Sequence, residues 1–416
     1  MDLKQHKGDN TSFKTFQRTY LVVYLLAQGS DWLQGPHVYA LYASYGLTSL
    51  QINQLFVVGF GASMIFGTVV GSFADKLGRK FNCMVFAVTY GLCCITKVFS
   101  NFWILMVGRL MGGTATSILF SAFEAWLVCE HTKRGFDNSL LSVVFSHASV
   151  GNSVVAIVAG LVAQFVASQF GFVAPFMVSL AFLVLLWWIV FTTWTENYGD
   201  AKADFLNSFA KGISAIKHDS LILCLGLIQS LFEGSMYTFV LEWTPALTPV
   251  DELGTKDAKK TIPHGWIFAC FMVSVTLGSF IFKYWSRISY PESFMRLVFA
   301  VSAMSLAVPV IFPKSYLYVF ISFLVFEVCV GIFWPALGTM RSKYIPEESR
   351  ATIMNVFRIP LNFIVIIILL QDLPVAVVFK CCVVFLICCC ALQFWMFWSL
   401  ESFKKSSKTE VLISDL

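Results

Sequence analysis

The ten residues GSFADKLGRK, from Gly71 to Lys80, are the stretch that most strongly indicates the fold of this chain. They join two long apolar segments and combine glycines with acidic and basic side chains. Glycine permits a tight turn and a close approach of two helices. Asp75 can accept charge-assisted hydrogen bonds from neighbouring bases or from a helix N-terminus. Such a connection is typical of a clasp that closes one side of a helix bundle, although a plain polar turn would also carry these charges.

The surrounding composition predicts a membrane protein. Of the 416 residues, 57% are hydrophobic and only 13% are charged, whereas a soluble domain has about 25% charged residues. The mean hydropathy is +0.74. Because one membrane-crossing helix needs about 20 apolar residues, the apolar content is sufficient for twelve helices and leaves little for a soluble domain. We therefore predict an all-α membrane protein.

The apolar segments define twelve predicted helices in two six-helix halves. We divide the chain into a cytoplasmic N-terminal segment (1–17), an N-terminal half (18–195), a cytoplasmic linker (196–218), a C-terminal half (219–400) and a cytoplasmic tail (401–416). The helices are expected at residues 18–45, 52–74, 82–100, 102–130, 139–168, 172–195, 219–247, 264–284, 293–312, 315–341, 349–371 and 374–400.

The distribution of positive charge predicts the orientation. If both termini are cytoplasmic, twenty of the 29 lysines and arginines lie on that side and four on the other. Positive charges accumulate on the cytoplasmic side of membrane proteins. The net charge of +5 therefore reflects topology, and we expect no nucleic-acid partner. Lys97 and Lys380 are expected to extend to a membrane interface.

Short strings recur in the two halves. GSFIFKYWSR, starting at Gly278, follows the eighth predicted helix as GSFADKLGRK follows the second. A weaker echo pairs Arg109-x-x-x-Gly113 with Glu327-x-x-x-Gly331. Two six-helix halves in parallel repeat are the arrangement of major facilitator transporters, and we predict that fold.

More specific strings resemble one family. Gly71, Asp75, Gly78, Arg79 and Lys80 match the hallmark that the major facilitator superfamily carries between its second and third helices. Four further strings make the chain similar to the molybdate-anion transporter family: DWLQGPHVYALY (31–42), LMVGRLMGGTATSILFSAFEAWLVCEH (105–131), IQSLFEGSMYTFVLEWTPAL (228–247) and NVFRIPLN (355–362). The resemblance implies uptake of molybdate across the plasma membrane by alternating access, for which a monomer suffices.

Polar residues within the helices are candidate binding groups. Molybdate is a tetrahedral dianion, which arginine forks and neutral donors suit. Arg358 and Asn362 share a helix face at i and i+4, and Arg109 is a second deeply placed base. We predict the following substrate-binding residues: Arg358, Asn362, Arg109, His147, Asn152 and Tyr39. His147 would also fit as a hydrogen-bonded core residue.

Buried carboxyl groups are candidates for coupling. A charge at mid-membrane costs about 2.5–3.5 kcal/mol, so such residues are functional candidates. Asp31, Glu233 and Glu327 lie near the middle of their helices and could couple uptake to a proton. The predicted coupling and gating set is Asp31, Glu233, Glu327, Glu124, Gly71, Asp75, Gly78, Arg79 and Lys80. Arg109 and Glu327 could instead pair with other buried charges, and Glu124 could join the clasp near Arg79 or Arg134.

Other functions remain open from the sequence. A sugar or organic-anion porter would use the same scaffold, and a non-transporting membrane sensor would keep the fold. Because the chain has no phosphate loop, metal-ligand spacing or nucleophile motif, we expect neither an enzyme nor a metal or other cofactor. The expected partners are a small oxyanion, the lipid bilayer and a coupling proton.

Overall fold

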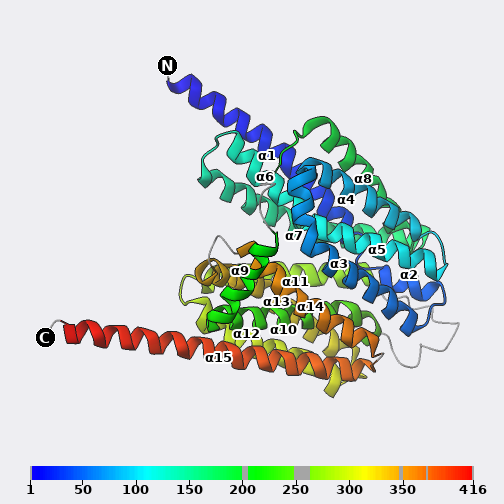
Figure 1. Cartoon of the computed structure of the whole chain (residues 1–416). Helices are drawn as coiled ribbons and strands as arrows, with labels where there is room; N and C mark the ends of the chain where they lie inside the picture. The colour runs from blue at the N-terminus through cyan, green and yellow to red at the C-terminus, as the bar shows by residue number, and fades with distance from the viewer. Residues whose placement is uncertain (1, 199–204, 248–262, 346–349, 372, 415–416) are drawn as a thin grey trace. The chain divides into compact units, whose positions relative to one another are not determined.

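The computed structural model describes residues 2–198, 205–247, 263–345, 350–371 and 373–414. Within these residues every regular element is an α-helix (Figure 1). The chain divides into two compact units. Unit 1 comprises Met1–Ala203 and Pro263–Cys270, and unit 2 comprises Asp204–Ile262 and Phe271–Leu416.

Unit 1 contains eight complete helices. They are α1 (Asp2–Trp32), α2 (Val38–Ser44), α3 (Ser49–Leu77), α4 (Arg79–Thr96), α5 (Phe102–Leu119), α6 (Ala122–Lys133), α7 (Asn138–Phe170) and α8 (Ala174–Thr193). Unit 2 contains α9 (Phe205–His218), α10 (Ser220–Leu247), most of α11 (His264–Trp285), α12 (Pro291–Ile311), α13 (Tyr316–Tyr344), α14 (Arg350–Leu370) and α15 (Val375–Ser414). The first turns of α11 belong to unit 1.

Twelve membrane-crossing helices follow from these elements. In the described part of the chain, nine stretches are long and apolar enough to cross a membrane, and α5 with α6 forms one of them. Helix α14 adds a shorter apolar stretch, Val356–Leu370. Helices α1 and α4 have sufficient length but contain more polar residues. The all-α fold class predicted from composition is confirmed.

Two predicted helices are interrupted, and one connection is helical. The first predicted helix (18–45) is divided into α1 and α2 around Gly35-Pro36, because proline lacks a backbone donor and restricts the residue before it. The fourth (102–130) breaks at Phe120, where Ser121 Oγ donates to the Ser117 carbonyl; such bonds bend helices. The linker contains α9, an amphipathic helix of 14 residues that is too short to cross a membrane.

The same packing scheme recurs in both units. In unit 1, α4 packs on α5 and α8, and α1 packs on α7 and α8. In unit 2, α12 packs on α13 and α15, and α10 packs on α14 and α15. Each helix of the first set thus has a counterpart at the same rank in the second set, as the internal repeat predicts.

Glycines allow two matching helix crossings. A Cβ atom on Gly113 of α5 would lie 2.2 Å from the Gly59 carbonyl oxygen of α3. A Cβ atom on Gly331 of α13 would lie 2.0 Å from the Val275 carbonyl oxygen of α11. Backbones approach this closely only where the side chain is hydrogen. The weaker sequence echo, which aligns Gly113 with Gly331, therefore corresponds to the same kind of contact in each unit.

We expect Gly331→Ala to lower the thermal unfolding temperature of the purified protein, because the added methyl group forces α11 and α13 apart. Overpacking of this kind costs about 1–3 kcal/mol. Gly338→Ala on the same helix is the matched control, since an added Cβ there meets no described atom within 4 Å. Equal unfolding temperatures for the two variants, measured by fluorescence in detergent, would contradict the close crossing.

Candidate functional site

Three helices of unit 2 bring together a polar cluster in an apolar interior. Gln229 and Glu233 lie one turn apart on α10, and their side chains are buried. Arg341 of α13 reaches both of them: its Nε donates to Gln229 Oε1 at 3.1 Å, and its Nη2 donates to Glu233 Oε1 at 3.4 Å. The side chain of Arg341 is 12% exposed and that of Glu233 is 5% exposed. The ion pair is therefore largely removed from water.

Arg358 of α14 brings a second positive charge near this ion pair. Its charge acts on both Glu233 and Arg341. Asn362, one turn further along α14, donates from Nδ2 to the Arg358 carbonyl oxygen at 2.8 Å. Two arginines near one another in a largely apolar surrounding are a suitable setting for an anion.

The contact between α10 and α14 fixes the place of Arg358. Ser230 Oγ donates to the carbonyl oxygen of Phe357 at 2.9 Å. A Cβ atom on Gly226 would lie 2.1 Å from the Phe357 ring, so glycine is required for the helices to meet here. Phe232 stacks on Phe333 with ring centroids 3.9 Å apart. These contacts therefore fix α10, α13 and α14, the helices that carry the cluster, against one another.

Glu327 is a separate buried carboxyl group. It lies on α13 and is 4% exposed. Fourteen positions separate it from Arg341 along the same helix, which corresponds to about 21 Å at 1.5 Å per residue. The structure therefore places Glu233 in the basic cluster and Glu327 at a different depth of unit 2.

The predicted residues of α1, α2 and α7 make pairwise contacts in unit 1. Asp31 accepts a hydrogen bond from the Tyr90 hydroxyl of α4 at 2.5 Å. Asn152 of α7 accepts one from the indole nitrogen of Trp32 at 2.8 Å. His147 of α7 is exposed and lies 2.9 Å from the Gln17 amide. Tyr39 is half-buried on α2. These contacts join α1 to α4 and α7 and do not unite His147 with Asn152.

Arg109 lies at the crossing of α3 and α5. Its Nε donates to the Leu55 carbonyl oxygen at 3.4 Å, and its guanidinium carbon lies 4.6 Å from the centre of the Phe56 ring. Lys97 of unit 1, expected to reach an interface, is instead 1% exposed. It donates to the Tyr42 hydroxyl. A helix C-terminus favours a cation, and Lys97 is the C-cap residue of α4, which explains its burial.

The predicted clasp meets the end of α8. Gly78 has φ 106° and stands before the first turn of α4. Glu196 accepts hydrogen bonds from the backbone nitrogens of Lys80 at 2.8 Å and Phe81 at 3.1 Å. A carboxylate is favoured at a helix N-terminus. Arg79 Nη1 donates to the Ala125 carbonyl oxygen at 3.2 Å. The clasp thus connects α4, α6 and the segment after α8.

The structure gives fewer contacts for the other predicted gating residues. Gly71 and Asp75 lie on α3, in the part of that helix whose side chains the structure does not describe. Glu124 is exposed in the first turn of α6. Arg134, one of its expected neighbours, pairs with Glu130 at 2.9 Å.

Unit 2 also has a carboxylate at the first turn of its third spanning helix. Glu292, in the first turn of α12, is 4% exposed. Its Oε1 accepts from Lys343 Nζ at 2.6 Å and from the Tyr344 hydroxyl at 2.5 Å. Gln393 of α15 donates to the Glu292 carbonyl oxygen at 3.0 Å. In each unit, a carboxylate therefore ties the first turn of the third spanning helix to neighbouring helix ends.

Sequence reasoning missed Arg341 and Gln229. Arg341 ends the predicted helix 315–341, where a base is typical of the cytoplasmic face. Helix α13 continues to Tyr344, and long side chains on a helix point back toward its N-terminus. Gln229 lies one turn before Glu233, which is the signal that could have found it.

Comparison with known proteins identifies the family. A family model described as sugar transporters with 12 transmembrane segments matches residues 2–331. Molybdate-anion transporters from Takifugu rubripes and Xenopus tropicalis are both 31% identical to this chain, over 389 and 371 residues. The matches cover 85% of this chain and 79% and 78% of those proteins. This chain belongs to the molybdate-anion transporter family. It is a multi-pass membrane transporter and not an enzyme.

Solved structures agree with the fold of this family. The nucleoside transporter NupG superposes with a TM-score of 0.69, at 12% identity, covering 93% of this chain and 99% of that one. A peptide transporter POT in complex with sulfate superposes with a TM-score of 0.70, at 12% identity, covering 93% and 94%. At such identities the likeness establishes the major facilitator fold alone.

We expect Arg341→Gln and Glu233→Gln to be energetically coupled in a double-mutant cycle. Removing Arg341 alone leaves a buried carboxylate with less compensation, whereas the double variant removes both charges. The expected coupling energy is about 1–3 kcal/mol, measured from thermal unfolding. Arg287→Gln, at an exposed position of unit 2, is the charge-matched control. Additive losses in the cycle would contradict the contact.

Proposed function

We propose that this chain takes up molybdate by secondary transport, with the cluster of Gln229, Glu233, Arg341 and Arg358 as its oxyanion site. The relatives from Takifugu rubripes and Xenopus tropicalis are named molybdate-anion transporters. The observation that supports the proposal most directly is that Arg341 pairs with the buried Glu233 while the charge of a second arginine, Arg358, acts on both. The predicted roles of Asn362, Arg109, His147, Asn152 and Tyr39 remain secondary proposals.

The chemistry of the cluster suits a tetrahedral oxyanion. Arginine presents several N–H donors in a fixed plane and can bind two oxygens of one anion. Arg341 already uses Nε and Nη2 on Gln229 and Glu233, so an incoming dianion competes with Glu233 for this guanidinium. Arg358 supplies the second positive charge. The competition limits affinity, and a transporter must release its substrate.

Glu233 is also our candidate for proton coupling. If a dianion binds Arg341 in place of Glu233, its two negative charges and the charge of Glu233 together exceed the two positive charges of Arg341 and Arg358. Protonation of Glu233 would remove that third charge and keep the site neutral. The same protonation would accompany the anion across the membrane, so uptake would follow an inward proton gradient. Asp31 and Glu327 remain alternative coupling groups.

The transport cycle we propose is alternating access, in which the site opens to one side of the membrane at a time. The clasp residues Gly78, Arg79 and Lys80 would hold the cytoplasmic side closed through Glu196, with Gly71 and Asp75 contributing from α3. The positive-inside distribution of charge supports cytoplasmic termini. We place the protein in the plasma membrane, where uptake from the medium takes place, and a monomer suffices for the cycle.

We expect cells that express the wild type to accumulate molybdate, measured by elemental mass spectrometry. Arg358→Gln and Arg341→Gln should each reduce uptake by at least about tenfold, because each removes a charge-assisted contact. Tungstate, a tetrahedral dianion of similar shape, should compete. Uptake should also rise with an inward proton gradient in the wild type and lose this dependence in Glu233→Gln.

The charge-matched control is Arg287→Gln at equal surface expression. Full uptake by both arginine variants would show that the substrate site lies elsewhere. If uptake did not depend on the proton gradient, proton coupling would be refuted. The proposal of the oxyanion site would be unaffected. Absence of molybdate uptake by correctly delivered wild type, together with uptake of a sugar, would favour the alternative that the family model's description supports.

A further inference from the structure

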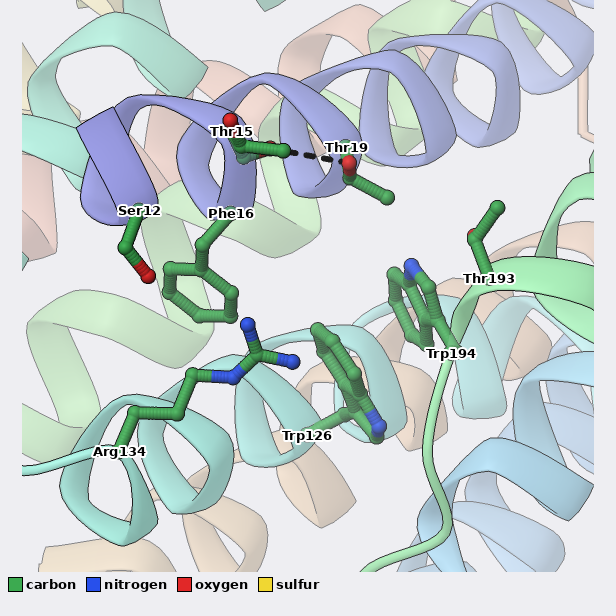
Figure 2. A pocket seen from close by; sticks show the side chains of 8 residues that line it. All are labelled: Ser12, Thr15, Phe16, Thr19, Trp126, Arg134, Thr193 and Trp194. Carbon is green, nitrogen blue, oxygen red and sulfur yellow. Dashed lines mark hydrogen bonds between the residues drawn. The ribbon is translucent and has the colours of Figure 1, made fainter. Parts of the chain in front are cut away.

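A pocket of about 640 Å³ opens in unit 1, away from the polar cluster of unit 2. One face of α1, the ends of α6 and α8, and the residues just beyond them enclose it (Figure 2). The lining combines hydroxyl groups, three aromatic rings and one guanidinium: Ser12, Thr15, Phe16, Thr19, Trp126, Arg134, Thr193 and Trp194. Neither the transport site nor the clasp uses this pocket.

The pocket lies where two membrane-crossing stretches end. The apolar stretch Phe102–Lys133 stops directly before Arg134, and Ala174–Thr193 stops directly before Trp194. Tryptophan is enriched at membrane–water interfaces, where one face of the ring is apolar and its N–H is polar. Both ends therefore place the pocket at the level of lipid headgroups, on the side with the larger number of basic residues.

Arg134 is the charged group of this pocket. Its Nε donates to Glu130 at 2.9 Å, and its guanidinium carbon lies 4.9 Å from the centre of the Phe16 ring. In Figure 2 the guanidinium is turned toward the space between Phe16 and Trp126. The side chain is 37% exposed. One of its five N–H donors serves Glu130, and the others suit the oxygens of a phosphate group.

The aromatic wall is rigid and contains an unused donor. Trp126 and Trp194 stack with ring centroids 3.6 Å apart and planes at 11°. The indole nitrogen of Trp126 donates to the Thr195 carbonyl oxygen at 2.8 Å. Trp194 is 3% exposed, and its indole nitrogen has no hydrogen-bond partner among the described residues. Its nitrogen-bearing edge is turned toward Thr19 and Thr193 in Figure 2. A buried donor without a partner is costly, so a bound acceptor would stabilise it.

The threonine hydroxyls add acceptors. Thr19 Oγ1 donates to the Thr15 carbonyl oxygen at 2.9 Å, and Thr193 Oγ1 donates to the Ile189 carbonyl oxygen at 2.6 Å. With their protons used in this way, both oxygens can still accept a hydrogen bond from a ligand. The pocket thus offers a cation and N–H donors for a phosphate and hydroxyl oxygens for an N–H or O–H group.

We propose that this pocket binds the headgroup of an anionic phospholipid that carries a hydrogen-bond donor beside its phosphate, with phosphatidylserine as the probe. The exposed bases Lys14 and Arg18 on α1 and Lys133 on α6 attract a headgroup of net negative charge. Choline offers no N–H or O–H group to the threonine oxygens, so phosphatidylcholine should bind more weakly. The site does not depend on which solute is transported.

The test is native mass spectrometry of the full chain in detergent, with phosphatidylserine and phosphatidylcholine of the same acyl chains. We expect phosphatidylserine to be retained preferentially. Arg134→Gln should weaken its binding by about tenfold or more. Lys133→Gln removes one positive charge from the neighbouring residue, which does not line the pocket, and should change binding by only about twofold.

A gain-of-binding variant keeps the test independent of folding. Because Glu130 competes with the phosphate for Arg134, Glu130→Gln should tighten phosphatidylserine binding. Weaker or unchanged binding in this variant would overturn the proposal, as would equal retention of the two lipids or equal effects of Arg134→Gln and Lys133→Gln. In the last experiment, inorganic phosphate and molybdate are added as competitors of the lipid. Displacement of the lipid by either anion at concentrations equal to that of the lipid would assign the pocket to a soluble oxyanion and refute the lipid site.

Discussion

The ion pair of Glu233 with Arg341 lies within range of the charge of Arg358 in unit 2, and the neighbouring packing fixes the helices that carry these three groups. Glu233 accepts from Arg341, while Arg358 acts on both charges from a third helix. A single ion pair in this surrounding would be self-contained. The second arginine brings a further positive charge close to this pair. The close contact at Gly226 and the bond from Ser230 to the Phe357 carbonyl hold α14 against α10, and we propose that the second arginine makes this ion pair part of a binding site.

The two units are stabilised by related contacts between their helices. Each brings two helices together at a glycine, Gly113 in unit 1 and Gly331 in unit 2. Each also holds a carboxylate at the first turn of its third spanning helix. Glu196 in unit 1 comes from the segment after the sixth spanning helix, whereas Glu292 in unit 2 belongs to the third spanning helix itself. A carboxylate at a helix N-terminus is favoured electrostatically, so either origin stabilises the same end of a six-helix bundle. The clasp is therefore one version of a device that both units contain.

The fold could be predicted from the sequence because membrane helices have two clear signals, long apolar runs and a biased placement of lysine and arginine. Sequence reasoning placed Arg358 and Glu233 at depths where charge is costly, and the structure brings both into one cluster. It could not foresee Arg341, because a base at the end of an apolar helix has the same pattern whether it faces water or turns back into the bundle. Lys97 was misplaced for a related reason: its burial depends on the end of α4 and on Tyr42, which is distant in sequence. The contacts that join Asn152 to Trp32 and Asp31 to Tyr90 likewise depend on helix packing.

The central claim is that the excess positive charge of Arg341 and Arg358 binds the transported oxyanion. Calorimetric titration of molybdate into the purified full chain tests it most directly, with Glu233→Gln and Arg358→Gln measured beside the wild type. The account predicts that Glu233→Gln binds molybdate at least as tightly as the wild type, since the competing carboxylate is gone, and that Arg358→Gln binds about tenfold more weakly or worse. Weaker binding by Glu233→Gln together with unchanged binding by Arg358→Gln would contradict it.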